Sequence, residues 1–217
     1  MLNKIPDPVS RLNDLYGTIA AAQAARRSEA EVEDRQNARQ SLQDALERAG
    51  APKRHVGRTP DRKTPWGVKL EVLAGLAGKG FLAGITGLHG GGKTQMGVEL
   101  MKDYAAKGKT VQFRTAKEFV LLIKETFGRP DKSELSVLRD HMRPDLLVID
   151  EIGKRGDSAW EEGVLFELLN RRYMDMKDTF VTANLTAAEF EASLGASLMS
   201  RMNEDAGLIV VDWQSFR

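Results

Sequence analysis

The sequence contains no cysteine and only three histidines, and each shortage excludes a class of chemistry. Without cysteine there is no disulfide, thiolate nucleophile or cysteine-ligated zinc. The histidines, His55, His89 and His141, are widely spaced, so a histidine-built metal centre is not expected. No stretch approaches the ~20 apolar residues of a membrane span. The N-terminus lacks the apolar run of a signal peptide. We therefore expect a soluble, cytoplasmic protein with no membrane partner.

The sequence also has no large excess of charge of either sign. The 32 lysines and arginines nearly balance 31 acidic residues, which gives a formal net charge of +1. A wholly basic nucleic-acid coat is therefore excluded, although a local basic patch is not. A chain of 217 residues accommodates one full domain plus a small appendage.

Residues 1–50 predict an N-terminal helical module. One apolar stripe has helical spacing and consists of Leu12, Leu15, Tyr16 and Ile19. Residues 20–48 are rich in good helix formers but poor in large apolar side chains, so a helix there buries little surface alone. Docking on a partner protein and packing as a solvated helix on its own domain both remain open.

Residues 51–66 predict a basic linker, because they contain three prolines and no periodicity. A direct contact with nucleic acid and simple solvation are both compatible with the positive charge of this segment. The rest of the chain, residues 67–217, alternates short apolar strands with amphipathic helices and is expected to form one domain.

The alternation predicts an α/β fold with a five-stranded parallel sheet flanked by helices. The expected strands are Phe81–Gly87, Thr110–Thr115, Leu146–Asp150, Thr179–Asn184 and Leu208–Asp212. The expected helices are Lys93–Ala106, Ala116–Thr126, Asp131–Met142, Ser158–Met176 and Ala187–Arg201.

A phosphate-binding loop is the strongest motif. Residues 87–94 read Gly-Leu-His-Gly-Gly-Gly-Lys-Thr and match G-x-x-x-x-G-K-[ST] between a strand and a helix. Glycines allow successive backbone N–H groups to surround phosphate oxygens. Lys93 would neutralise the β- and γ-phosphates, and the Thr94 hydroxyl would ligate Mg²⁺. The expected nucleotide-binding residues are Gly87, Gly90, Gly91, Gly92, Lys93 and Thr94. A chance glycine-rich turn is the competing interpretation.

The apolar strand 146–150 ends in Asp150 and Glu151, which is typical of a Walker B element. Asp150 would hold the hydrated Mg²⁺, and Glu151 would polarise the attacking water. Strands often end in acidic residues, so the pair gains meaning from the phosphate loop that precedes it. The glutamate favours hydrolysis of ATP over phosphate transfer to a small acceptor.

Two further residues are candidates for the same site. Asn184 follows an apolar strand, where it could sense the γ-phosphate or simply form a turn. Arg201 closes the last helix, where it could reach a neighbouring subunit's nucleotide or simply complement the helix dipole. Trp66, Trp160 and Trp213 are expected to be packing residues.

With these elements placed, residues 81–217 resemble the DnaC/IstB branch of the AAA+ ATPases, a group of ASCE P-loop proteins. The resemblance is carried by residues 146–153, by 169–173 (Leu-Asn-Arg-Arg-Tyr), by 182–184 (Thr-Ala-Asn), by 200–202 (Ser-Arg-Met), and by 212–217 (Asp-Trp-Gln-Ser-Phe-Arg), together with 119–127. It implies a domain without a C-terminal lid, ATP and Mg²⁺ as cofactors, Asn184 as sensor 1, and Arg201 as an arginine finger acting in trans.

The resemblance implies an ATPase that loads a replicative DnaB-type helicase onto DNA. The N-terminal helices would bind the helicase, and the ATPase domain would associate with copies of itself and contact single-stranded DNA. Candidate DNA or intersubunit contacts are Lys154, Arg155, Arg171 and Arg172, although structural ion pairing is equally compatible with each. Two alternatives remain open: an IstB-like transposition helper on duplex DNA, and an ATP-switched interaction module with little turnover.

Overall fold

The computed structural model describes residues 31–87, 89–154 and 159–216. The apolar stripe at residues 12–19 and the candidate contact Arg155 lie outside them. The chain divides into two compact units, Met1–Leu42 and Gln43–Arg217. The described residues of the first unit, 31–42, are helical, and the second unit begins with helical residues 43–48. Within the described residues no helix is long and apolar enough to cross a membrane.

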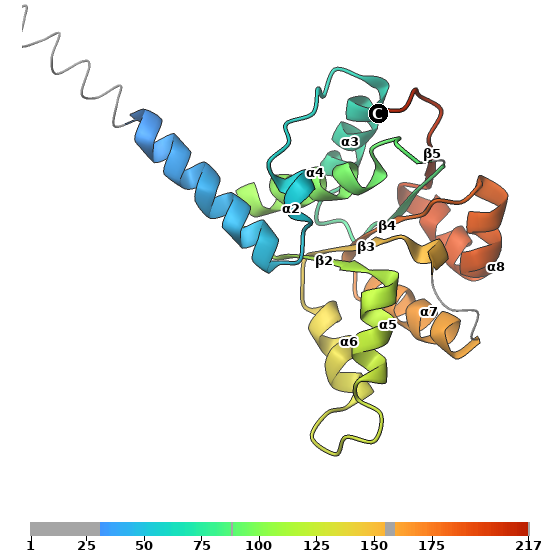
Figure 1. Cartoon of the computed structure of the whole chain (residues 1–217). Coiled ribbons are helices and arrows are strands. Elements are labelled where there is room, and N and C mark those ends of the chain that lie inside the picture. Colours follow the sequence, from blue (N-terminus) through green and yellow to red (C-terminus); the bar gives the residue numbers. More distant parts are fainter. Residues whose placement is uncertain (1–30, 88, 155–158, 217) are drawn as a thin grey trace, which may run out of the picture. The chain divides into compact units, whose positions relative to one another are not determined.

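The described part of the second unit contains a five-stranded parallel sheet in the order β2-β3-β4-β1-β5 (Figure 1). Its strands are β1 (Leu82–Thr86), β2 (Val111–Thr115), β3 (Leu146–Asp150), β4 (Asp178–Thr182) and β5 (Leu208–Val210). Its helices are α2 (Lys53–Val56), α3 (Pro65–Gly75), α4 (Lys93–Ala106), α5 (Ala116–Lys124), α6 (Glu134–Met142), α7 (Ala159–Met174) and α8 (Ala187–Asp205), with a 3-10 turn, η1, at Ile152–Lys154. The predicted P-loop sheet is confirmed.

Helices cover both faces of the sheet, which is why its central strands are apolar throughout. All five residues of β1, of β3 and of β4 are buried. The helix α4 lies on one face, where Gly97 packs so closely that a Cβ would lie 2.8 Å from Val148 Cγ1. The helices α5 to α8 cover the other face (Figure 1). Buried side chains of α5, α7 and α8 form one cluster with residues of β1, β3 and β4, and partly buried side chains of α6 pack against it.

Two helices begin directly after loop or strand residues that cap them. Thr115, the last residue of β2, caps α5, and its side chain and that of Glu118 form a reciprocal capping box. Thr186 and Glu189 form the same box at the start of α8. Such caps satisfy N–H groups that the first helical turn leaves without partners. They fix where each helix leaves the carboxyl edge of the sheet.

The segment 51–66, which the sequence predicts as a linker, contains α2 and packs within the second unit. The side chains of Val56 and Trp66 are 2% and 1% exposed. Thr64 caps α3, and Pro65 occupies its first turn, where the missing N–H costs nothing. Arg62 donates two hydrogen bonds to Asp103 of α4, at 2.8 and 3.1 Å. The prolines here therefore begin and end short elements of the fold.

Arg172 is a structural residue of this unit. It is fully buried, although the sequence suggested a DNA or intersubunit contact. Its guanidinium donates to Thr179 Oγ1 and to three backbone carbonyls, those of His141, Pro144 and Asp178, at 2.7 to 3.2 Å. Burial lowers the pKa of Arg172 to about 10. With its donors used internally, this side chain is not available to DNA.

Candidate nucleotide-binding site

The phosphate loop joins β1 to α4, and its backbone depends on glycine for two different reasons. Gly90 and Gly92 have φ angles of 92° and 76°, in the region that side chains disfavour. Gly91 needs glycine for lack of space, because a Cβ there would lie 2.5 Å from Val211 Cγ1. The loop is thus shaped both by its own conformation and by the segment that follows β5.

Lys93 begins α4 and is 6% exposed. Its ammonium donates a hydrogen bond of 2.8 Å to the Gly87 carbonyl, across the loop. Burial lowers the pKa of Lys93, and the nearby carboxylates of Asp150 and Glu151 act in the opposite direction. A buried cation at the start of a helix, beside the loop amides, is well placed to hold an anionic phosphate.

Thr94 and Asp150 meet at the carboxyl edge of the sheet. The Thr94 hydroxyl lies 3.1 and 3.3 Å from the two carboxylate oxygens of Asp150 and donates toward them. Burial raises the pKa of Asp150, and the hydrogen bonds from Thr182 and Thr94 oppose that rise. A buried carboxylate beside a hydroxyl fits Mg²⁺, which accepts few protein oxygens and keeps several waters. These two residues would hold the ion, and its charge would offset the cost of burying the carboxylate.

Thr182 is a site residue that the sequence did not reveal. It ends β4, is 1% exposed, and donates a short hydrogen bond to Asp150 Oδ1. The same hydroxyl accepts the backbone N–H of Glu151 at 3.2 Å. One buried hydroxyl therefore positions both Walker B residues. A threonine in an apolar strand looks like an ordinary strand former, so only the register of β3 beside β4 discloses this role.

Glu151 follows β3 in a left-handed conformation, with a φ of 59°. This conformation is costly for a residue with a side chain and is typical of functional positions. Asn184 Nδ2 donates to Glu151 Oε1 at 3.5 Å, so the structure brings the candidate sensor and the candidate base together. The amide can therefore orient the carboxylate, or a water placed between the two groups.

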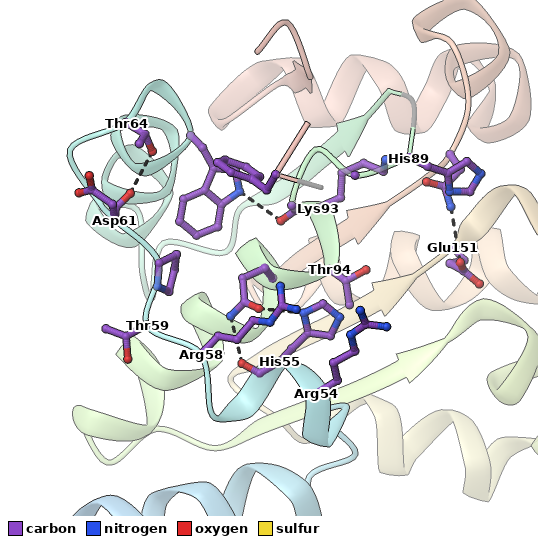
Figure 2. Close-up of a pocket in the computed structure, with 17 residues that line it drawn as sticks. Arg54, His55, Arg58, Thr59, Asp61, Thr64, His89, Lys93, Thr94 and Glu151 are labelled. Carbon is purple, nitrogen blue, oxygen red and sulfur yellow. Dashed lines mark hydrogen bonds between the residues drawn. The ribbon is translucent and has the colours of Figure 1, made fainter. Parts of the chain in front are cut away.

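These residues border a cavity of about 810 Å³ (Figure 2). Figure 2 shows Arg54, His55 and Arg58 on the α2 side of the cavity, across from Lys93 and Thr94. The lining residues are Arg54, His55, Arg58, Thr59, Pro60, Asp61, Thr64, Trp66, His89, Gly90, Gly92, Lys93, Thr94, Gln95, Glu151, Asn184 and Phe216. About half of this wall comes from residues 51–66, the expected linker, in which no motif indicates a place at the site.

The α2 side of the cavity is attached to the phosphate-loop helix. His55 Nδ1 lies 2.8 Å from Gln95 Oε1, and Gln95 Nε2 donates to the His55 carbonyl at 3.1 Å. Lys102 Nζ donates to the Arg58 carbonyl at 2.6 Å. These bonds hold the segment against α4, the helix that begins with Lys93.

Arg201 lies outside the cavity formed by the described residues. It donates to Asn170 Oδ1, and its guanidinium carbon is 5.3 Å from the centre of the Tyr173 ring. From this position Arg201 does not line the nucleotide cavity of its own chain. The position is compatible with a contact to the nucleotide of a neighbouring subunit. Arg171 is half-exposed and pairs with Glu167.

The model of one family, described as "IstB-like ATP binding protein", matches residues 75–217. The chain belongs to this family. The match covers the whole phosphate loop, both Walker B carboxylates, Asn184 and Arg201, and it makes the protein an IstB-like AAA+ ATP-binding protein. These residues all lie within the matched range, in a family whose description names ATP binding.

Relatives of this IstB-like protein include replicative helicase loaders. The replicative helicase loader DnaC of Escherichia coli (strain K12) is 30% identical over 133 residues, which are 61% of this chain and 54% of DnaC. The chain thus matches about half the length of that relative. A crystal structure of the DnaC helicase loader covers 71% of this chain and 92% of its own, with a TM-score of 0.60 and 20% identity.

A second similar structure is that of the replication initiator DnaA bound to AMPPCP and single-stranded DNA. It covers 68% of this chain and 46% of its own, with a TM-score of 0.58 and 16% identity. At these identities both structures show the fold alone. They agree with the five-stranded AAA+ sheet described above.

Proposed function

We propose that this protein hydrolyses ATP and uses the nucleotide to control its assembly on DNA. The observation that carries the proposal is the continuous set of contacts from Thr94 through Asp150 and Thr182 to Glu151 and Asn184. Lys93 would bind the β- and γ-phosphates, and Thr94 and Asp150 would hold Mg²⁺, which would neutralise charge on the γ-phosphate and on the departing ADP. Glu151 polarises the attacking water, and Asn184 orients it.

The biological role that we propose is the loading of a replicative DnaB-type helicase. The identity with DnaC, itself named a replicative helicase loader, supports this role. Residues 1–50 would dock on the helicase, the segment 51–66 would connect them to the ATP site, and residues 67–217 would form the ATPase. Copies would assemble side by side, with Arg201 of each reaching the nucleotide of the next.

An aromatic and cationic cluster supports the contact with single-stranded DNA. Phe127 is 51% exposed, and its ring centre lies 5.1 Å from that of the half-buried Trp160. Lys124 Nζ lies 5.9 Å from the Trp160 ring centre and also pairs with the Glu161 carboxylate, which a phosphate would have to compete with. Bases stack on exposed aromatic rings while a nearby cation attracts the phosphates. We propose this cluster as the DNA contact, in place of Arg172, which is buried.

The ATPase proposal is tested with two variants of the site. Glu151→Gln should bind ATP with nearly wild-type affinity but hydrolyse it at least a hundredfold more slowly, since only the water-polarising group is lost. Lys93→Ala should lose binding itself. Calorimetry gives the affinities and phosphate release gives the rates. Equal, negligible hydrolysis by the wild type and Glu151→Gln would instead favour an interaction module that switches with ATP but hardly turns it over.

The loader proposal is tested with the whole chain. The protein should co-purify with a DnaB-type helicase and stimulate its placement on DNA coated with single-strand-binding protein. Deleting residues 1–42, the first compact unit, should abolish both effects while ATP hydrolysis persists. Phe127→Ala should weaken binding to single-stranded DNA, by about 1–3 kcal/mol if one base stacks there.

A transposition helper remains the second candidate, because the family model begins at residue 75 and does not cover the N-terminal unit. Such a helper would form filaments on duplex DNA in the presence of ATP and recruit a transposase. Preference for duplex over single-stranded DNA in a filter-binding assay, with no helicase co-purifying, would favour this candidate over the loader.

A further inference from the structure

Three consecutive carbonyls of the phosphate loop accept hydrogen bonds from two distant parts of the chain. Residues 211–216, which we call the C-terminal strap, supply two of the donors. The Phe216 N–H donates to Gly90 O at 3.0 Å, and Trp213 Nε1–H donates to Gly91 O at 3.0 Å. The third donor is Trp66 Nε1–H, at 3.1 Å from Gly92 O, a carbonyl that also accepts the Met96 N–H of α4 at 2.9 Å.

The strap is joined to the sheet and packed on the loop. It leaves β5, and the Val211 N–H donates to the Thr86 carbonyl at 2.9 Å. The Val211 side chain fills the space that a Cβ on Gly87 or Gly91 would need, at 2.8 and 2.5 Å. A Cβ on Gly92 would lie 2.9 Å from Trp66 Nε1 and 3.0 Å from the Phe216 ring. The loop's glycines thus also serve the close approach of these segments.

Peptide geometry gives these bonds a consequence for phosphate binding. In a trans peptide unit the carbonyl of one residue and the N–H of the next point in opposite directions. Holding the carbonyls of Gly90, Gly91 and Gly92 toward their donors therefore turns the N–H groups of Gly91, Gly92 and Lys93 the other way. A phosphate loop needs successive N–H groups that point to one side.

We propose that Trp66 and the C-terminal strap are positioning elements that hold the phosphate loop in its anion-binding conformation. This inference rests on the proposed ATP site. Neither indole has to touch the phosphates, because each acts through the orientation of the loop. Without the donors, a smaller fraction of molecules has the binding conformation of the loop. The apparent affinity for ATP falls in proportion to that fraction.

The proposal makes the two segments responsive to the nucleotide. If the strap favours the ATP-binding loop, then bound ATP favours the docked strap by the same factor. Trp66 is the last residue of the segment 51–66 and lies in the first turn of α3, so the same reciprocity reaches the part of the chain that precedes residues 67–217. Binding of the nucleotide would in this way affect both Trp66 and the C-terminal strap.

The test is Trp213→Phe, which keeps an aromatic ring and removes the donor. Its Kd for ATP·Mg²⁺, measured by calorimetry, should rise about three- to tenfold, as expected for one neutral hydrogen bond. KM for ATP should rise by the same factor while kcat at saturating ATP stays within about twofold, because the Walker B residues are untouched. Trp66→Phe should behave alike, and a chain that stops after Asp212 should bind still more weakly.

Tyr104→Phe is the matched control, because it also removes one donor from a buried aromatic side chain of this unit. Tyr104 Oη donates to Asp178 Oδ2 at 2.6 Å, at the far end of α4. This variant should lose thermal stability yet keep the wild-type Kd. If Trp213→Phe binds ATP as tightly as the wild type, or if Tyr104→Phe weakens binding equally, the inference is overturned and the ATP site stands. If the wild type binds no ATP, both the site and the inference fall.

Discussion

Removal of the Thr182 hydroxyl is the most incisive perturbation of the ATP site. Thr182→Val keeps the shape of the side chain and deletes two buried hydrogen bonds, one to the Asp150 carboxylate and one from the Glu151 amide. A hydrogen bond to a charged group contributes about 1.5–3 kcal/mol and a neutral one about 0.5–1.5 kcal/mol. We therefore expect the free energy of unfolding to fall by about 2–4 kcal/mol in the absence of nucleotide.

Activity should fall for a separate reason. The Glu151 backbone is left-handed, and the Thr182 hydroxyl is one of the groups that hold it there. Loss of that anchor lets the water-polarising carboxylate move, and misplacement by about 1 Å can cost a hundredfold in rate. We expect kcat for ATP hydrolysis to decrease at least tenfold at saturating ATP.

Thr179→Val separates the two effects. Thr179 lies in the same strand, is also 1% exposed, and accepts from Arg172 Nε at 2.9 Å while it donates to the Lys177 carbonyl at 3.2 Å. This variant should lose similar stability in urea unfolding and retain its kcat. If both variants lose activity equally, or if Thr182→Val hydrolyses ATP at the wild-type rate, the bridging role assigned to Thr182 is refuted.

Three further outcomes are expected. Arg172→Met should lower the free energy of unfolding by about 3–5 kcal/mol, because it leaves buried carbonyls without their hydrogen-bond donor. The exposed Arg171→Met should change the same quantity by less than about 0.5 kcal/mol. Urea titrations of the two variants measure the difference. Burial lowers the pKa of His141 below its usual 6.5, so at a given pH the unfolded chain binds a proton at this residue more readily than the folded chain does. The free energy of unfolding should therefore decrease as the pH falls below 6.5. His141→Gln should flatten that part of the stability profile, and an unchanged slope would contradict the assignment. Arg201→Ala should be inactive alone but regain ATP hydrolysis when mixed with Glu151→Gln subunits, which a cis arginine could not achieve.

The sequence predicted the sheet and the loop because their signals are local. The bounds of β3 and α4 are those expected, since an apolar run ending in Asp150 and a glycine loop ending at Lys93 leave little freedom. The helices α2 and α3 were missed, because proline spacing alone reads as a break in structure and the apolar partners of Val56 and Trp66 lie elsewhere in the chain.

The supporting contacts of the site could not be read from the chain. Thr182 acts through its register beside β3, and Trp213 acts across 122 positions. Thr182 and Trp213 lie in stretches that carry the family resemblance, but nothing in those stretches indicates the hydrogen bonds that the two side chains make. The sequence therefore predicted only packing for Trp66 and Trp213. Packing is correct for the buried Trp66, but it omits the bond that each indole makes to the loop. For Arg172 the sequence left a DNA contact and a structural role open, because nothing local indicates that an arginine on a helix is buried; the structure shows the structural role.

At Glu151 the left-handed backbone conformation lowers the stability of the fold, while the side chain is the one to which we assign a role in hydrolysis. A glycine there would adopt the same φ without a steric penalty and should give a more robust fold, because the strain costs of the order of 1–3 kcal/mol. That gain would remove the carboxylate to which we assign the polarisation of the attacking water. Selection for thermal stability alone should therefore favour glycine at position 151 and yield an inactive protein. Engineering for stability should keep Glu151 unchanged.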